Sequence, residues 1–336
     1  MVTAPSRTDS GWCGTGCRGW SIPPIMTTPV PSTLPVFRWA FIGPTYWPQW
    51  VLIGAIGLCS LLPRVAMLGV GRLLGRLFFW RNKKRRHIAD VNISLCFPDL
   101  SDGQRADMVR RHFLAYGQGI VDLGLVWWAT RKRLDRWCSI SGIEKCQVVF
   151  ESGEKVLLVT PHTVGIDLGG VMLSRCWPGV SMMKRPNDPF LAWWLWRCRS
   201  RTGAQILMRD QGLRSLIKAM RQGRCAYLMP DEDLDSKHSV FVPFFSTQAA
   251  TLPIVGRLAA VTGAKVLPVI TRLQDSGHYQ VCIGDPLTDF PTRDDAVDAR
   301  RINGVFEASL RGAPHQYLWT LKWFNTQPQG ASSPYD

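Results

Sequence analysis

The pattern of hydrophobic and polar positions changes near residue 155. From there on, short apolar runs alternate with longer segments whose apolar positions recur at helical spacing. The predicted strands cover residues 156–160, 180–184, 205–208, 225–229, 240–245, 265–271 and 278–283. The predicted helices cover residues 165–176, 188–201, 211–221, 250–262 and 293–311. This alternation is typical of an α/β fold, so we expect a mixed central sheet flanked by helices.

A different pattern precedes this region: the stretch from Trp39 to Pro63 carries no charged residue. It is long enough to cross a hydrocarbon core of about 30 Å as a helix. Pro44 and Pro48 interrupt its beginning, and a buried or interfacial helix is the alternative. We therefore expect a transmembrane or membrane-anchoring helix over residues 38–63, placed before the α/β fold.

Basic residues follow this apolar stretch in large excess. Only Arg7, Arg18 and Arg38 come before it, whereas residues 64–90 hold Arg64, Arg72, Arg76, Arg81, Lys83, Lys84, Arg85 and Arg86. Such an excess marks the cytoplasmic side of a membrane segment. Residues 65–79 also carry apolar residues at helical spacing. We expect residues 64–90 to form a basic amphipathic segment on an anionic membrane surface, with the domain that follows on the cytoplasmic side.

The rest of the chain divides into a main domain and two ends. Residues 1–37 are rich in Pro, Ser, Thr and Gly without a period, which predicts a disordered extension. Residues 91–328 form the predicted main domain. Its first part reads as helices interrupted at residues 97–99, and Ser101 is placed to cap the next helix. Residues 329–336 are expected to be a flexible tail.

Composition narrows the class of function. The 336 residues include 40 Lys and Arg against 25 Asp and Glu, a formal charge of +15. This charge favours an anionic partner such as nucleic acid, a membrane surface or an acidic protein. The cysteines include no C-x-x-C pair, which argues against a zinc site and a disulfide framework. Neither a glycine-rich phosphate loop nor a G-x-S-x-G elbow is present, so nucleotide-driven chemistry and serine hydrolysis lose support.

The strongest candidate for chemistry is a strand-to-helix corner. The strand at residues 156–160 is stopped by Pro161, and His162 then lies five positions before Asp167. In α/β proteins the carboxyl ends of strands carry the functional residues. A carboxylate in the first turn of the helix could orient the imidazole as a general base. An accidental pairing is the alternative, although none of the other five histidines has an acid at this spacing.

Further polar residues follow other predicted strands. Arg185 and Asn187 come after the strand at 180–184, and an arginine there could bind a phosphate or polarise a carbonyl. Asp231 and Asp233 belong to an acidic run that could bind a metal or pair with Arg185 or Arg209. Surface turns and a solvated acidic loop are the simpler alternatives.

These motifs, taken in order, carry a resemblance. They are Pro161-His162-x3-Ile166-Asp167, Arg185-Pro-Asn187, Arg209-Asp210, Tyr227-Leu-Met-Pro-Asp231-Glu-Asp233, Phe241-Val-Pro-Phe-Phe245 and Gln316-Tyr-Leu-Trp319. The set resembles the late lauroyl/myristoyl acyltransferases of lipid A assembly in Gram-negative bacteria, over about residues 38–328. The resemblance makes residues 91–328 an acyltransferase domain.

The resemblance implies a membrane-anchored O-acyltransferase that needs neither a cofactor nor a metal and does not bind nucleic acid. Its partners would be acyl-acyl carrier protein, a Kdo-bearing lipid A precursor and the anionic inner-membrane surface. A fatty acyl chain of the C12–C14 class would pass to a hydroxyacyl chain of the precursor. His162 would be the base and Asp167 its partner, while Arg185, Asn187, Arg209, Asp231 and Asp233 would help to build the site.

Two alternative functions remain open. A glycerophospholipid or lysophospholipid acyltransferase uses a similar His-x4-Asp pair, although the Pro-Glu-Gly-x-Arg element is absent here. A non-catalytic scaffold that binds anionic membranes through residues 64–86 would also explain the basic segment.

Overall fold

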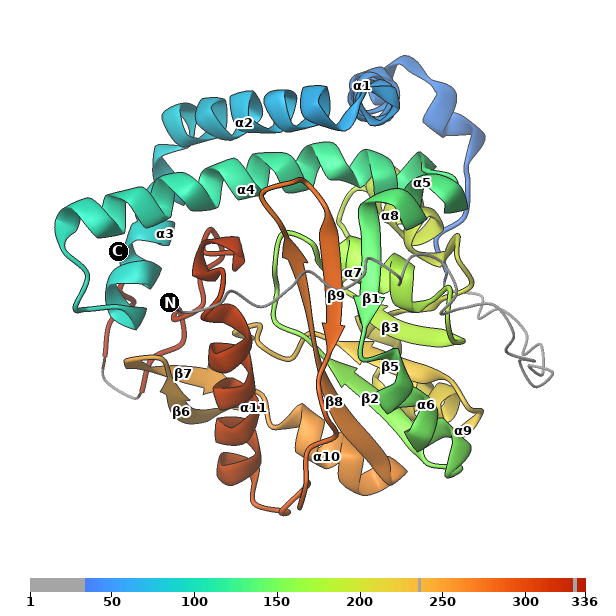
Figure 1. The fold of residues 1–336 in the computed structure, drawn as a ribbon, viewed down its shortest axis with the longest axis vertical. Helices are drawn as coiled ribbons and strands as arrows, with labels where there is room; N and C mark the ends of the chain where they lie inside the picture. The colour runs from blue at the N-terminus through green and yellow to red at the C-terminus, as the bar shows by residue number, and fades with distance from the viewer. Residues whose placement is uncertain (1–33, 235–236, 329–330) are drawn as a thin grey trace, which may run out of the picture.

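A seven-stranded sheet forms the centre of the protein (Figure 1). The computed structural model describes residues 34–234, 237–328 and 331–336. The strand order is β1-β9-β8-β2-β5-β3-β4. Strands β8, β2, β5, β3 and β4 are parallel, whereas β9 pairs with β8 in the antiparallel sense and with β1 in the parallel sense. The predicted mixed central sheet flanked by helices is confirmed.

The seven predicted strands are present, each within two residues of its predicted ends. Two short strands, β1 and β7, were not predicted, and the antiparallel pair β6–β7 stands apart from the main sheet. Because residues 247–251 pair with β6, helix α10 begins four residues later than predicted. The strands are β1 (Cys138–Ser141), β2 (Lys155–Val159), β3 (Gly179–Met183), β4 (Gln205–Met208), β5 (Cys225–Leu228), β6 (Val240–Phe244), β7 (Thr247–Thr251), β8 (Ala264–Leu273) and β9 (Tyr279–Ile283).

Helices cover both faces of the sheet. Helices α9, α10 and α11 pack on one face, and α6 and α7 pack on the other. The predicted cap at Ser101 is confirmed at the start of α4, where Ser101 and Gln104 bond reciprocally in a capping box. The helices of this domain are α3 (Lys83–Cys96), α4 (Asp102–Trp128), α5 (Arg131–Trp137), α6 (Ile143–Glu151), α7 (Ile166–Leu173), α8 (Pro189–Ser200), α9 (Leu213–Arg221), α10 (Ile254–Thr262) and α11 (Asp295–Leu310).

The apolar stretch at residues 38–63 does not form one long helix, so that prediction is wrong. Two short 3-10 turns, Trp39–Ile42 and Pro44–Tyr46, precede α1 (Trp47–Leu61). Pro44 breaks the stretch near its start and Pro63 ends it, since proline cannot continue a helix from the preceding turn. The 15 residues of α1 span only about 22 Å. Across the described ranges, no helix is both long and apolar enough to span a bilayer.

Helix α2 (Arg64–Arg81) is packed with its small residues inward. Gly71 and Gly75 lie against α4, and a β-carbon on Gly75 would come within 2.5 Å of the Phe113 carbonyl oxygen. Met67 is buried with them and Leu74 packs on the core, whereas Leu73 and Leu77 are exposed next to Arg72 and Arg76. The predicted amphipathic helix therefore exists, but it presents apolar and basic residues together on its outer side.

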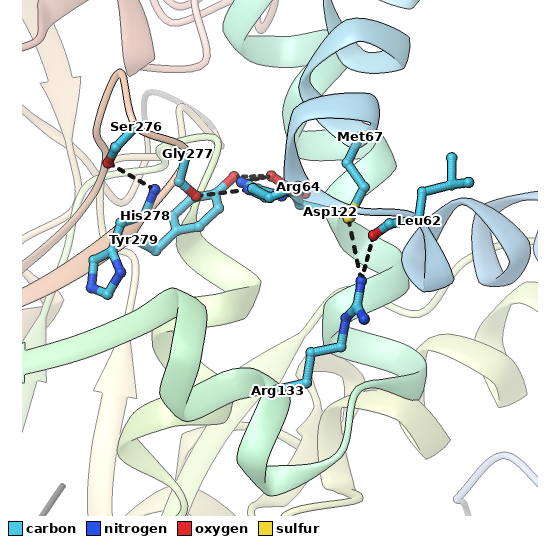
Figure 2. A network of polar contacts seen from close by, with 9 residues as sticks. All are labelled: Leu62, Arg64, Met67, Asp122, Arg133, Ser276, Gly277, His278 and Tyr279. Carbon is cyan, nitrogen blue, oxygen red and sulfur yellow. Dashed lines mark hydrogen bonds and ion pairs between the residues drawn. The ribbon is translucent and has the colours of Figure 1, made fainter. Parts of the chain in front are cut away.

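A buried ion pair fixes α2 to the domain (Figure 2). Arg64 bonds both carboxylate oxygens of Asp122 on α4, and the Arg64 Nε donates to the Gly277 carbonyl at 2.9 Å. The Tyr279 hydroxyl donates to the same carboxylate at 2.8 Å. A second contact nearby joins Arg133 to the Leu62 carbonyl at 2.8 Å. A buried charge without its counter-charge is strongly destabilising, so Arg64 and Asp122 must be buried together. This requirement helps to fix how α2 packs on α4.

The two predicted ends of the chain are described only in part. Residues 1–33 of the predicted disordered extension, and residues 329–330 of the predicted flexible tail, are outside the described residues. Further along the tail, Tyr335 is buried and its hydroxyl bonds the Asn92 side chain. This residue packs on the main core instead of extending from it.

Candidate active site

The carboxyl ends of two neighbouring parallel strands bring His162 and Asp231 together. Strands β2 and β5 pair in a register that places Val159 opposite Leu228. His162 lies three residues beyond Val159, and Asp231 lies three residues beyond Leu228. The same offset on adjacent parallel strands puts both side chains at the same point of the sheet edge.

Three hydrogen bonds orient the Asp231 carboxylate. The His162 Nδ1 lies 2.6 Å from one carboxylate oxygen, and the His162 backbone N–H donates to the other at 2.8 Å. The Tyr317 hydroxyl donates to this second oxygen at 3.0 Å. Since a carboxylate only accepts, Nδ1 carries the ring proton in the neutral imidazole. The unprotonated nitrogen is then Nε2, and no hydrogen bond to it occurs within the part of the chain that the structure describes.

The C-terminal segment holds the His162 loop in place from the other side. The Leu318 N–H donates to the His162 carbonyl at 3.0 Å, and the Val164 N–H donates to the Gln316 carbonyl at 3.0 Å. The Trp323 ring lies 5.6 Å from the imidazole and stacks on Tyr317. The backbone on both sides of the imidazole is therefore fixed by hydrogen bonds.

The electrostatic environment favours a charged His162 more than water does. Burial by itself lowers the pKa of His162, but the Asp231 carboxylate outweighs it, and Glu232 adds to the effect. The resulting pKa lies above the ordinary value of 6.5. The Tyr317 hydroxyl has its pKa raised by burial and by Asp231, so it remains a neutral donor.

Asp167 does not bond His162, contrary to the role expected from its spacing. It lies in the first turn of α7, where both of its oxygens accept hydrogen bonds from Arg199 of α8, at 2.7 and 3.2 Å. The Nδ1 of His162 is already bonded to Asp231, and Arg199 holds the Asp167 carboxylate. Asp167 nevertheless lines the same cavity as His162.

The other predicted residues lie around this edge in different settings. Arg185 bonds Asp210 at 2.8 Å on the surface, where it lowers the pKa of that carboxyl, and Asn187 is exposed beside it. Arg209 pairs with Glu232, which confirms that the acidic run pairs with a predicted arginine. Asp233 accepts a bond from the Thr326 N–H at 2.6 Å.

A metal site is the other alternative that the sequence leaves open for the acidic run after β5. Within residues 34–234, 237–328 and 331–336, no three His, Cys, Asp or Glu side chains come together as metal ligands.

A cavity of about 250 Å³ opens beside His162. Its polar lining comes from the sheet edge and includes His162, Asp167, Arg199, Arg209 and Glu232. The rest is largely apolar and follows the strands back to Gly179, the first residue of β3. Five strand residues extend roughly 13 Å, so the cavity is a slot along the sheet with a polar end at the imidazole.

Comparison with known proteins identifies the family to which this chain belongs. The sequence profile of a family described as bacterial lipid A biosynthesis acyltransferase matches residues 34–326. The chain belongs to this family. The order of motifs in the sequence predicted the same family, so the prediction is confirmed.

Individual members of the lipid A acyltransferase family are similar over most of their length. A lipid A biosynthesis lauroyltransferase from Escherichia coli K12 is 34% identical over 307 residues, which cover 90% of this chain and 100% of that protein. A lipid A biosynthesis myristoyltransferase from the same strain is 30% identical over 308 residues, 90% of this chain and 94% of that protein. A palmitoleoyltransferase from that strain is also 30% identical, over 89% of this chain.

Two residues that the structure places at the site were not among the predicted site residues. Tyr317 bonds Asp231, and Arg199 bonds Asp167. Tyr317 belongs to one of the motifs that carry the family resemblance, so that motif could have indicated a role for it. Arg199 is one of 40 basic residues, and nothing in its local sequence separates it from the others.

Proposed function

We propose that this protein transfers a fatty acyl chain of the C12–C14 class from acyl carrier protein to a hydroxyacyl chain of a Kdo-bearing lipid A precursor. His162 acts as the general base and Asp231 orients it. The observation that carries this proposal is the 2.6 Å contact between the His162 Nδ1 and Asp231, next to a largely apolar cavity that His162 lines. Family membership supports the reaction class.

The reaction needs a base because a hydroxyl is a poor nucleophile at neutral pH. The His162 Nε2 removes the hydroxyl proton as the oxygen attacks the thioester carbonyl carbon, and the Asp231 carboxylate stabilises the imidazolium that forms. The tetrahedral intermediate then expels the thiolate as the carbon–sulfur bond breaks. The imidazolium returns the proton to sulfur, so the products are an ester and the free thiol of the carrier.

The developing oxyanion needs a donor at the same edge. Arg185 was one candidate, but its contact is with Asp210 and it does not line the cavity. Arg209 lines the cavity, and its charge lowers the pKa of His162, as expected for a nearby cation. We therefore propose that Arg209 stabilises the oxyanion, and that its partner Glu232 holds the guanidinium at this edge of the sheet.

The proposed acceptor is a membrane lipid, which requires a surface that contacts the bilayer. The outer side of α1 and α2 offers one, because large apolar side chains are exposed there among cations. The apolar members are Val51, Leu52, Leu58, Leu61, Val65, Leu73, Leu77 and Trp80. Such a surface favours binding in the interface of an anionic membrane, here the inner membrane. Binding to vesicles with and without anionic lipid tests this part.

The proposed reaction is tested with purified protein, lauroyl-acyl carrier protein and two acceptors in mixed micelles. One acceptor is a Kdo-bearing lipid A precursor, and the other is a lysophospholipid. Transfer to the lipid A precursor, detected by mass spectrometry, is the expected result. Transfer only to the lysophospholipid would overturn the acceptor assignment, and absence of transfer to either would favour a non-catalytic membrane-binding role.

A further inference from the structure

A second cavity, of about 510 Å³, lies on the opposite face of the sheet from the His162 cavity. It is formed between α9 and α10, and its lining is mostly apolar. Tyr227 lines the first cavity and Leu228 lines the second. Consecutive residues of one strand point to opposite faces, so β5 separates the two cavities along most of their length.

The two cavities meet at the carboxyl edge of the sheet. Met182, Met229, Arg209 and Glu232 line both of them. Arg209 and Glu232 also contribute to the electrostatic field at His162. The α9–α10 cavity therefore adjoins the His162 cavity at the Arg209–Glu232 pair, which is where a substrate arm would pass from one to the other.

The outer end of the α9–α10 cavity is basic. Helix α9 buries Leu216, Ala219 and Met220 and exposes Arg214, Lys218 and Arg221 on its other side. No ion pair to these three cations occurs within the described residues. They line a shallow depression together with Ile217 and Val261, which also line the α9–α10 cavity. Three unpaired cations at the mouth of an apolar cavity are complementary to an acidic partner that carries an alkyl chain.

We infer that α9 is the docking surface for an acidic acyl carrier protein, and that the carrier's thioester-bearing arm reaches His162 through the α9–α10 cavity. This inference rests on the proposed function, because it requires a carrier-borne donor. It assigns the two substrates to different sides of the protein. Figure 1 shows α9 and α10 at the end of the molecule away from α1 and α2, where the acceptor lipid is proposed to approach.

The test is a triple charge reversal on α9, Arg214→Glu, Lys218→Glu and Arg221→Glu. The matched control reverses three exposed cations elsewhere, Arg110→Glu, Arg293→Glu and Arg311→Glu, and changes the net charge equally. Each protein is assayed with lauroyl-acyl carrier protein and with the lauroyl thioester of N-acetylcysteamine, which lacks the carrier. The acceptor is the lipid A precursor in both assays.

The α9 variant is expected to raise KM for lauroyl-acyl carrier protein at least about tenfold, from the loss of three rim contacts. Its KM for the lipid acceptor and its turnover of the small thioester should stay within twofold of wild type. Rising salt should weaken wild-type kcat/KM for the carrier more steeply than that of the variant. The control should leave every parameter near wild type.

Two results would overturn the inference while the proposed function stands. One is an unchanged KM for the carrier in the α9 variant, and the other is an equal rise in the control, which would indicate a general charge effect. If the triple variant loses turnover of the small thioester as well, the three single reversals are measured, and they must then show the carrier-specific effect. A wild-type protein that uses the small thioester but not the carrier would instead refute the carrier as donor.

Discussion

Two buried aspartates in this protein have similar partners and different roles. Asp231 accepts from His162 and from the Tyr317 hydroxyl, whereas Asp122 accepts from Arg64 and from the Tyr279 hydroxyl. Both clusters therefore combine a carboxylate, a basic side chain and a buried tyrosine. The base differs: the arginine is always charged and buried, whereas the imidazole can gain and lose a proton and lines a cavity.

This difference indicates which cluster serves chemistry and which serves structure. All charges of the Arg64–Asp122 cluster are paired within the protein, so its contribution is to hold α2 on α4. The His162–Asp231 cluster leaves Nε2 available to a substrate. The following variants test this contrast, in order of decreasing expected effect.

Replacing the base should have the largest effect. His162→Ala is expected to lower acyl transfer by about 10⁴-fold, the upper range for loss of a general base, because no other group receives the hydroxyl proton. Folding and vesicle binding should be retained. His278→Ala is the control, since that ring is bonded to Ser139 away from the cavity, and it should transfer at nearly the wild-type rate. Near wild-type turnover by His162→Ala would exclude the base assignment.

Removing the structural aspartate should act on stability. Asp122→Ala leaves Arg64 buried without its counter-charge, so the free energy of unfolding should fall by about 3–5 kcal/mol. Denaturant unfolding followed by circular dichroism measures it. Asp135→Ala removes a half-exposed partner of Arg175 and should cost about 1 kcal/mol or less. Equal losses in both variants would mean that the buried cluster does not hold the N-terminal helices.

The catalytic aspartate should control both rate and pH dependence. A general base acts when neutral, so wild-type kcat/KM should rise with pH through the raised pKa of His162. In Asp231→Asn the carboxylate charge is lost and burial dominates, so the pKa falls and the acid limb moves to lower pH. The plateau rate should drop by about 10²–10³-fold, because the amide can donate to Nδ1 and favour the wrong tautomer. An acid limb that does not move would show that Asp231 does not control the pKa of His162.

Removing the hydroxyl of Tyr317 or of Tyr279 should have the smallest effect, and the two variants compare the two clusters directly. Each phenylalanine variant removes one hydrogen bond to a charged group and should lower stability by about 1.5–3 kcal/mol. Tyr317→Phe should in addition lower the rate by about tenfold, because Asp231 loses one of its fixed donors. Tyr279→Phe should leave the rate within twofold. A rate loss in both variants would show that the structural cluster also controls the site.

Local sequence signals were sufficient for seven of the nine strands that the structure describes and for the sheet edge at His162. The seven strands are short apolar runs, and Pro161 ends the one that precedes His162, whereas β1 and β7 were not predicted. The partner of His162 could not be obtained in this way, because it depends on β2 and β5 being neighbours in the sheet although they are far apart in sequence. Asp167 was chosen because it is close in sequence, and the helix turns it towards Arg199 instead.

The N-terminal region shows a second limit of local patterns. The absence of charged residues over 39–63 predicted an apolar stretch, but it could not predict whether that stretch forms one helix. The prolines divide the stretch into shorter elements. In α2 the glycines and Met67 face the protein, whereas Leu73 and Leu77 are exposed, so apolar spacing alone predicted the helix but not its buried side. Close helix contact through glycine determined the buried side.

The most direct test of the central claim is a comparison of Asp231→Asn with Asp167→Asn under identical conditions. Single-turnover transfer from lauroyl-acyl carrier protein to the lipid A precursor is measured across pH for both variants. Our account predicts the large loss and the downward shift of the acid limb only in Asp231→Asn, whereas Asp167→Asn should lose less than about tenfold, since its partner Arg199 is not the base. The reverse pattern, with the large loss and the shift in Asp167→Asn, would contradict the assignment of Asp231 as the residue that orients His162.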